Sequence, residues 1–332
     1  MLICRDCFAD IELRSEVETN AVLDGECEVC HSKGKLIDSS EFDEFFSVLL
    51  ALFEPSESGE TVSEIIQKDW HLFANVGVAE VLLSNVLERL SLGYEISDKV
   101  GYSSDISDRV SIWARVKRSV KYKSRFFTSM DEFAQYDYLQ SSLSLSPGHA
   151  SLYRSRITPE GKEILSLDEM YCPNKTQARA GRANPIGIPY LYLSDSAKTT
   201  YFEVRAVYLD RLSVGEFKIA RELNLVDFKC DLNLWLDFAD GTKDLRESVI
   251  KKKVIDDISR DLSKPLRRYD SELEYVPTQL ICEYCKEALQ ADGICYGSSL
   301  YKEGVNYVLF NQDMAKCVGV EAHEITKIDI DR

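Results

Sequence analysis

The sequence predicts an α+β protein of 332 residues that is built from three consecutive parts. The first 36 residues carry four cysteines in two close pairs. Apolar residues then recur at helical spacing, and after residue 146 short runs rich in tyrosine, leucine and β-branched residues alternate with helical patches. We therefore expect a small cysteine-bearing segment over residues 1–36, an all-α domain over 37–140 and an α+β domain over 146–332.

The middle part has the pattern of amphipathic helices. Apolar side chains recur every three or four residues along its first segment, at Phe42, Phe45, Phe46, Leu49, Leu50 and Phe53. Pro55 and Gly59 are expected to end this helix. Similar patterns predict helices at Thr61–Trp70 and Val78–Leu90.

The last part begins after a serine-rich stretch, residues 141–148, which is typical of a linker. Strands are predicted at Ser151–Ile157, Tyr190–Leu193 and Val305–Phe310, and helices at Thr199–Val207 and Pro277–Leu289. Pro277 suits the first turn of its helix, where a missing N–H is harmless.

Composition excludes several classes of protein. No run approaches 18 consecutive apolar residues, and Arg5 leaves no room for the apolar region of a signal peptide. We therefore expect a cytoplasmic protein with no membrane partner, whose ten cysteines are reduced thiols or metal ligands. The 56 acidic and 40 basic side chains give a net charge of −16, which disfavours nucleic-acid partners at long range.

One segment is basic although the chain as a whole is acidic. Residues 109–125 contain seven Lys or Arg residues in 17 positions, interleaved with Trp113, Val116, Val120 and Tyr122. The spacing favours an amphipathic helix with a solvated charged face, and the alternative is a nucleic-acid groove.

The N-terminal cysteines have the spacing of a zinc knuckle. Cys4 and Cys7 form one CxxC pair, and Cys27 and Cys30 form a second pair after 19 residues. Two such pairs converge on one tetrahedral Zn²⁺, and four thiolates leave no open position, so the ion would be structural. His31 is a weaker candidate ligand, and the alternative is four thiols without metal. A third CxxC, at Cys282 and Cys285, fits two buried thiols on a helix better than a metal or redox pair.

The sharpest signal lies in the last part. A Gly-Arg-Ala-Asn-Pro-Ile-Gly loop at residues 181–187 leads into a strand with Tyr192 and a helix with Glu203. Much later come the doublet Ser298-Ser299 and the strand Gly-Val-Asn-Tyr-Val-Leu-Phe at 304–310. These motifs, in this order, resemble the RES-domain family over roughly residues 150–312.

The resemblance implies site residues position by position. The catalytic set would be Glu203, Ser298 and Tyr192, with Ser299 as the alternative serine. Binding of NAD⁺ would fall to Arg182, Arg154, Tyr192 and Asn184. One departure is Ala183, because the family usually has an aromatic residue after the motif arginine.

The family resemblance also implies a fold and a function. The last part would have an ADP-ribosyltransferase-like fold, and the helical part with its zinc knuckle looks similar to the HEPN-like domains fused to RES modules. Members are toxins that consume NAD⁺ and are neutralised by a partner antitoxin. We therefore expect an NAD⁺-degrading toxin, acting by hydrolysis or phosphorolysis, with transfer of ADP-ribose to a protein or nucleic acid as the alternative. A homo-oligomer is compatible with the sequence.

The chemistry of NAD⁺ cleavage suits these residue types. Breaking the nicotinamide–ribose bond passes through an oxocarbenium-like transition state, which a carboxylate such as that of Glu203 stabilises. An arginine fork such as that of Arg182 fits a pyrophosphate. Tyr192 offers a flat face to the nicotinamide ring, and Ser298 offers a hydroxyl to the ribose or the amide.

Overall fold

The computed structural model describes residues 1–135, 137–139, 142–148, 150–229, 231–264 and 272–327. The chain divides into two compact units, and each unit consists of two stretches of sequence. The first unit is Met1–Ser111 with Asp231–Lys252, and the second is Ile112–Cys230 with Lys253–Arg332. Residues 112–140 thus belong to the second unit, and residues 231–252 belong to the first.

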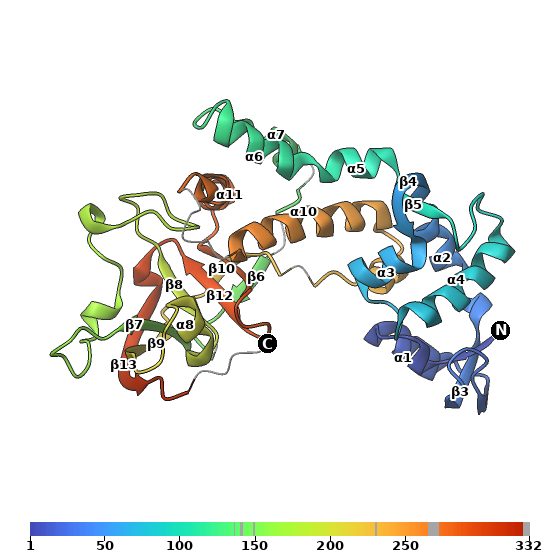
Figure 1. Ribbon diagram of the computed structural model, residues 1–332, viewed down its shortest axis with the longest axis horizontal. Coiled ribbons are helices and arrows are strands. Elements are labelled where there is room, and N and C mark those ends of the chain that lie inside the picture. The colour runs from blue at the N-terminus through green and yellow to red at the C-terminus, as the bar shows by residue number, and fades with distance from the viewer. Residues whose placement is uncertain (136, 140–141, 149, 230, 265–271, 328–332) are drawn as a thin grey trace. The chain divides into compact units, whose positions relative to one another are not determined.

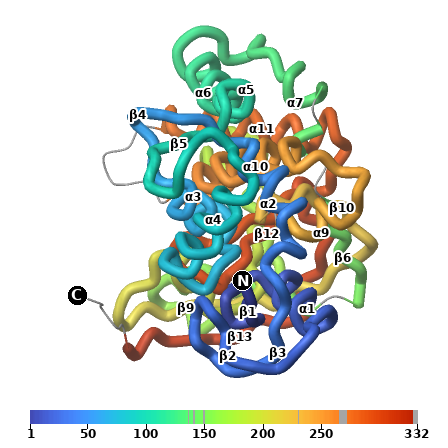
Figure 2. Tube along the Cα trace, turned by 90° about the vertical axis from the view of Figure 1, so that its right-hand side faces the viewer, coloured from blue at the N-terminus to red at the C-terminus, as the bar shows by residue number. Residues whose placement is uncertain are grey.

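The first unit begins with a three-stranded antiparallel sheet in the order β1-β3-β2 (Figure 2). Its elements are β1 (Leu2–Cys4), α1 (Ile11–Asn20), β2 (Leu23–Glu26) and β3 (Lys33–Asp38). Asp10 starts α1, because its carboxylate accepts hydrogen bonds from the backbone N–H groups of Glu12 and Leu13.

The predicted helices of the middle part are confirmed. They are α2 (Asp43–Leu50), α3 (Val62–Trp70) and α4 (Val76–Leu90), and the unit also holds α5 (Ser104–Val110), α9 (Leu234–Ala239) and the first part of α10 (Leu245–Ser263). Trp235 explains why the later stretch joins this unit. Its ring contacts those of Phe42 and Phe45 edge-on, at centroid distances of 5.5 and 5.3 Å.

The prediction that residues 37–140 are all-α is wrong. The chain forms an antiparallel pair of strands there, β4 (Phe53–Thr61) and β5 (Lys99–Tyr102). Pro55 and Gly59 do follow the end of α2, but they lie in a strand. At Gly59 a Cβ atom would lie 1.9 Å from the carbonyl oxygen of Val100, so only glycine allows this approach of the two strands.

The second unit is built around an eight-stranded sheet in the order β13-β9-β7-β8-β12-β11-β10-β6. Its strands are β6 (Ser142–Leu145), β7 (Leu152–Ile157), β8 (Leu191–Ser194), β9 (Arg211–Ile219), β10 (Leu223–Asp227), β11 (Gly293–Gly297), β12 (Val305–Leu309) and β13 (Ala315–Glu324). All of these strands except β11 are labelled in Figure 1. All neighbours are antiparallel except β10 and β11, which are parallel. This mixed sheet with helices agrees with the predicted α+β class.

The helices of this unit are α6 (Ile112–Tyr122), α7 (Asp131–Gln135), α8 (Ala197–Glu203), the second part of α10 and α11 (Val276–Glu287). Helix α8 packs against β7 and β8, and α11 packs against β11 and α6. Pro277 lies in the first turn of α11, as predicted. Within the described part of the chain, no helix has the length and apolar character that crossing a membrane requires.

The serine-rich stretch is a strand and not the predicted linker. Residues 142–145 form β6, which pairs with β10 at the edge of the sheet. The alternation of serine and leucine has the period of a strand, and Leu145 is fully buried in the core of the sheet. Ser141 lies outside the described residues.

Asp292, which directly precedes β11, is hydrogen-bonded to the start of the neighbouring parallel strand β10. Its carboxylate accepts two hydrogen bonds from the Arg221 guanidinium and one from the backbone N–H of Asn224. These bonds, and chiefly those from Arg221, lower the pKa of the Asp292 carboxyl.

We expect Asp292→Asn to lower the stability of this unit by about 1–2 kcal/mol at pH 7. Because the folded state lowers the pKa, the ionic contribution is present above the unfolded value of about 3.9 and is lost as the pH falls below it. The difference in the free energy of unfolding between wild type and variant, measured with urea, should therefore narrow from pH 5 to pH 3. An unchanged difference would show that the charge of the Asp292 carboxylate does not contribute to stability.

Candidate functional site

A pocket opens where β7 and β8 separate. The two strands pair at a single position, Tyr153 with Ser194. The next antiparallel pairs would be Arg154 with Leu193 and Ser155 with Tyr192, but these four residues line a cavity of about 250 Å³ instead. Tyr153 and Ser194 line it as well, and its remaining lining comes from α8 and the residue after it, from β11 and from β12: Thr200, Glu203, Val204, Tyr296 and Asn306.

Glu203 is held by two donors at this pocket. Its Oε1 accepts hydrogen bonds from Ser298 Oγ at 2.9 Å and from Asn306 Nδ2 at 2.7 Å. The amide oxygen of Asn306 in turn accepts a hydrogen bond from Ser194 Oγ at 2.7 Å. Ser298, Asn306 and Ser194 are buried, so the carboxylate at the end of α8 has a fixed orientation.

The two serines of the doublet point to different partners. Ser298 contacts Glu203, and its hydroxyl also accepts from the backbone N–H groups of Leu300 and Tyr301 at 3.3 Å. The hydroxyl of Ser299 donates to the carbonyl of Ser263 at the end of α10. The structure thus brings Ser298, and not Ser299, together with Glu203.

Arg154 places a partly buried cation in the same pocket. Its Nη1 donates to the carbonyl of Tyr192 at 3.3 Å, and its Nε is buried without a hydrogen-bond partner. No ion pair of this guanidinium is found among the described residues. Burial, and then the neighbouring charge of Arg156, lower the pKa of Arg154 to about 10. A guanidinium whose Nε has no hydrogen-bond partner suits an anionic ligand, which could accept from it.

Tyr192 and Asn184 join the strand to the loop at 181–187. The Tyr192 hydroxyl donates to Asn184 Oδ1 at 2.8 Å and accepts from the backbone N–H of Ala183 at 3.1 Å. The space is tight, since a Cβ on Gly181 would lie 2.5 Å from Asn184 Oδ1. Burial raises the pKa of Tyr192 well above its usual value, so the phenol stays protonated. Tyr192 thus lines the pocket, and its hydroxyl holds the loop.

Arg182 does not line this pocket. Its Nη1 donates to the carbonyl of Leu262 at 2.9 Å, near the carboxyl end of α10, and its own carbonyl accepts from Thr278 Oγ1. A cation at this end of a helix is favourable. Its positive charge still affects the pocket residue Tyr296. Burial raises the pKa of the Tyr296 phenol, and the Arg182 charge partly opposes that rise.

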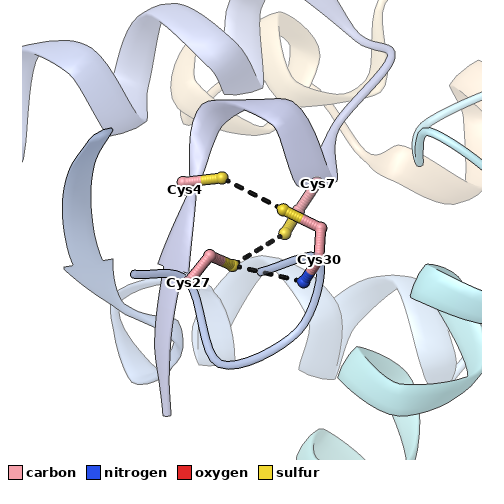
Figure 3. A group of neighbouring side chains, drawn as sticks. All are labelled: Cys4, Cys7, Cys27 and Cys30. Carbon is pink, nitrogen blue, oxygen red and sulfur yellow. Dashed lines mark hydrogen bonds between the residues drawn. The ribbon is translucent and has the colours of Figure 1, made fainter. Parts of the chain in front are cut away.

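The four N-terminal cysteines converge as their spacing predicted (Figure 3). Their Sγ atoms all lie within 4.8 Å of one another, with Cys4 and Cys30 at 3.3 Å and Cys7 and Cys27 at 3.4 Å. A tetrahedral ion with Zn–S bonds of 2.3 Å needs sulfur atoms about 3.8 Å apart, so this donor set fits zinc after small shifts.

The surroundings of these cysteines also favour a bound cation. The backbone N–H groups of Val29 and Cys30 donate to Cys27 Sγ, which supports negative charge on that sulfur. Burial raises the pKa of Cys4 to about 12 and that of Cys7 further, so without a cation both stay protonated. A metal that binds thiolates would reverse this.

The third CxxC pair behaves as predicted. Cys282 and Cys285 are fully buried on α11. Burial raises the pKa of both thiols, which is typical of packing residues and not of a reactive pair.

Two residues of the Glu203 network were not assigned as site residues from the sequence. Asn306 and Ser194 face each other in the register of β12 and β8. The signal in the sequence was a polar residue inside the apolar strand β12 and another at the end of the apolar strand β8, and buried polar side chains of this kind are usually hydrogen-bonded. Recognising their connection to Glu203 requires the pairing of strands distant in sequence.

Fold and site together define an α+β protein whose pocket combines a fixed carboxylate with a partly buried guanidinium. A family model for the RES domain matches residues 151–330. The match covers more than half of the chain, and the chain therefore belongs to the RES domain family. No curated protein sequence matches it.

One solved structure with similarity to this chain is the M. tuberculosis MbcT–MbcA toxin–antitoxin complex. The identity is 15%, and the alignment covers 58% of this chain and 92% of that chain, with a TM-score of 0.33. A TM-score this low does not establish a shared fold.

Proposed function

We propose that this protein is an NAD⁺-consuming toxin whose pocket between β7 and β8 cleaves the bond between nicotinamide and ribose. The observation that carries the proposal is the pairing, in one cavity, of the fixed Glu203 carboxylate with the Arg154 guanidinium that has a buried, unpartnered Nε. NAD⁺ offers the complementary groups, since its ribose becomes positive as the bond breaks and its pyrophosphate is anionic.

The reaction would proceed by departure of neutral nicotinamide, which takes the electron pair of the broken C–N bond. Glu203 would stabilise the cationic ribose, because two donors hold its Oε1 and leave the carboxylate oriented. The oxygen of water or phosphate would then bond to the ribose carbon and lose its proton to solvent. The cavity, about 250 Å³, is smaller than the roughly 300–1,000 Å³ of typical ligand pockets, so it would enclose the nicotinamide half of the substrate.

The four N-terminal cysteines would hold a structural zinc ion in this protein. Four sulfur ligands close the coordination sphere, so the ion would stabilise the small β1-β3-β2 sheet and take no part in the cleavage. The resemblance to the RES-domain family implies a partner antitoxin, and we propose such a partner here.

Arg154 and Arg182 give a matched pair of variants that separates ligand binding from support of the loop. Arg154→Lys keeps a charge but loses the planar fork, so KM for NAD⁺ should rise about 10- to 100-fold, with a smaller change in kcat. Arg182→Lys loses the bond to Leu262, so it should lower the melting temperature and raise KM less. A larger rise in KM for Arg182→Lys would assign the substrate phosphates to Arg182 instead.

The fate of ADP-ribose decides among the possible acceptors. The wild-type protein is incubated with NAD⁺ labelled in its adenine, with and without phosphate. Free labelled ADP-ribose indicates hydrolysis, its 1″-phosphate indicates phosphorolysis, and label on the protein or on added macromolecules indicates transfer. Unchanged NAD⁺ in every condition would contradict the proposal.

A further inference from the structure

The carboxyl end of α6 and the chain that follows it expose aromatic and basic side chains together. Tyr122, Phe126 and Phe127 are 70, 88 and 91% exposed. Arg118, Lys123 and Arg125 are exposed between and beside them. Large aromatic side chains rarely stay this exposed without a partner, and these stand among cations in a chain with a net charge of −16. We call this set, with Lys264, the α6 surface.

The cations of α6 fall into two groups. Arg115, Lys117 and Lys121 are neutralised by ion pairs with Glu132, Asp261 and Glu274, respectively. Within the described ranges, the structure gives no ion pair for Arg118, Lys123, Arg125 or Lys264. These four charges are therefore available to an anionic partner.

A cavity beside α6 is lined by several side chains of the α6 surface. Its volume is about 290 Å³, and its lining includes Arg118, Lys264, Tyr122 and Thr278. Four cations and two carboxylates line it, and both carboxylates are engaged by lysines. Phosphate groups fit a concave site with surplus positive charge, whereas a flat membrane surface does not enter it.

We propose that the α6 surface binds single-stranded nucleic acid. Exposed aromatic rings stack on unpaired bases of any sequence, and the cations beside them pair with the phosphates. The net charge of the whole chain does not prevent this, because charges more than about 8 Å away are screened at physiological salt. The surface also adjoins the loop at 181–187, since Arg125 and Phe126 line one cavity together with Pro185 and Ile186.

The test uses fluorescence anisotropy of the full-length protein with a labelled 20-nucleotide single strand of mixed sequence. Four phosphate contacts predict a slope of about −3 for log affinity against log salt, so binding should weaken about 50-fold from 50 to 200 mM salt. Arg118→Ala with Lys264→Ala should reduce that slope by about 1.4. Phe126→Ala with Phe127→Ala should weaken binding about tenfold or more and should leave the slope unchanged.

Matched controls lie on exposed side chains away from this surface. Lys316→Ala on β13 removes a cation, and Tyr208→Ala removes an aromatic ring that is 60% exposed. Both should bind like wild type. The proposal is overturned if the wild type does not bind, if the controls lose as much affinity as the paired variants, if duplex binds more tightly than single strand, or if anionic lipid vesicles bind while the oligonucleotide does not. Since NAD⁺ turnover is not measured, the outcome is independent of the proposed activity.

Discussion

Glu203→Gln should reduce the rate of NAD⁺ cleavage at least about 100-fold, the scale of removing one preorganised electrostatic group. Glutamine keeps the size of the side chain, and its amide oxygen can still accept from Ser298 and Asn306. What it loses is the negative charge that would face the developing cation on the ribose. The effect should appear in kcat, measured by nicotinamide release, with little change in melting temperature.

Glu160→Gln is the matched control, because Glu160 is exposed beyond the end of β7 and away from the pocket residues. It should retain full turnover. Growth inhibition on expression should disappear with Glu203→Gln and persist with Glu160→Gln. Undiminished turnover by Glu203→Gln would show that the carboxylate only supports the end of α8.

Replacing Cys4 and Cys27 by serine should abolish metal binding and unfold the small N-terminal sheet. Each change removes one member of a different sulfur pair, so two ligands remain for an ion that needs four. Elemental analysis should find about one zinc per wild-type chain and none in the variant. Hydrogen exchange should report loss of protection over residues 1–38, because binding of structural zinc supplies folding free energy.

Cys282→Ala with Cys285→Ala is the control for this experiment. These thiols are buried on α11 and far in sequence from the N-terminal set, so this variant should keep its zinc even if packing suffers. Full zinc retention by the Cys4/Cys27 variant would exclude the four-sulfur site.

Local patterns in the sequence predicted most individual elements. Helical spacing of apolar residues anticipated α2, α3 and α4, and the turn position of Pro277 anticipated the start of α11. The errors arose where pairing with distant residues decides the structure. The segment 53–61 becomes a strand because residues 99–102 lie beside it, and residues 142–145 become one because β10 offers an open edge.

The candidate site was likewise predicted where local motifs carry the signal and missed where contacts between distant residues decide. The order of motifs indicated Glu203, Ser298, Tyr192 and Arg154, and the structure places all four at or beside one pocket. Asn306 was missed as a partner of Glu203 because 102 residues separate them between β12 and α8. Arg182 matched a motif, but its hydrogen bond to Leu262 depends on the packing of α10, which no local pattern encodes.

The most direct test of the account is the release of free nicotinamide when purified wild-type protein is incubated with NAD⁺. Chromatography should show nicotinamide accumulating in step with the loss of NAD⁺, and at least about 100-fold more slowly with Glu203→Gln. Intact NAD⁺ after incubation with folded, zinc-loaded wild-type protein would contradict the account.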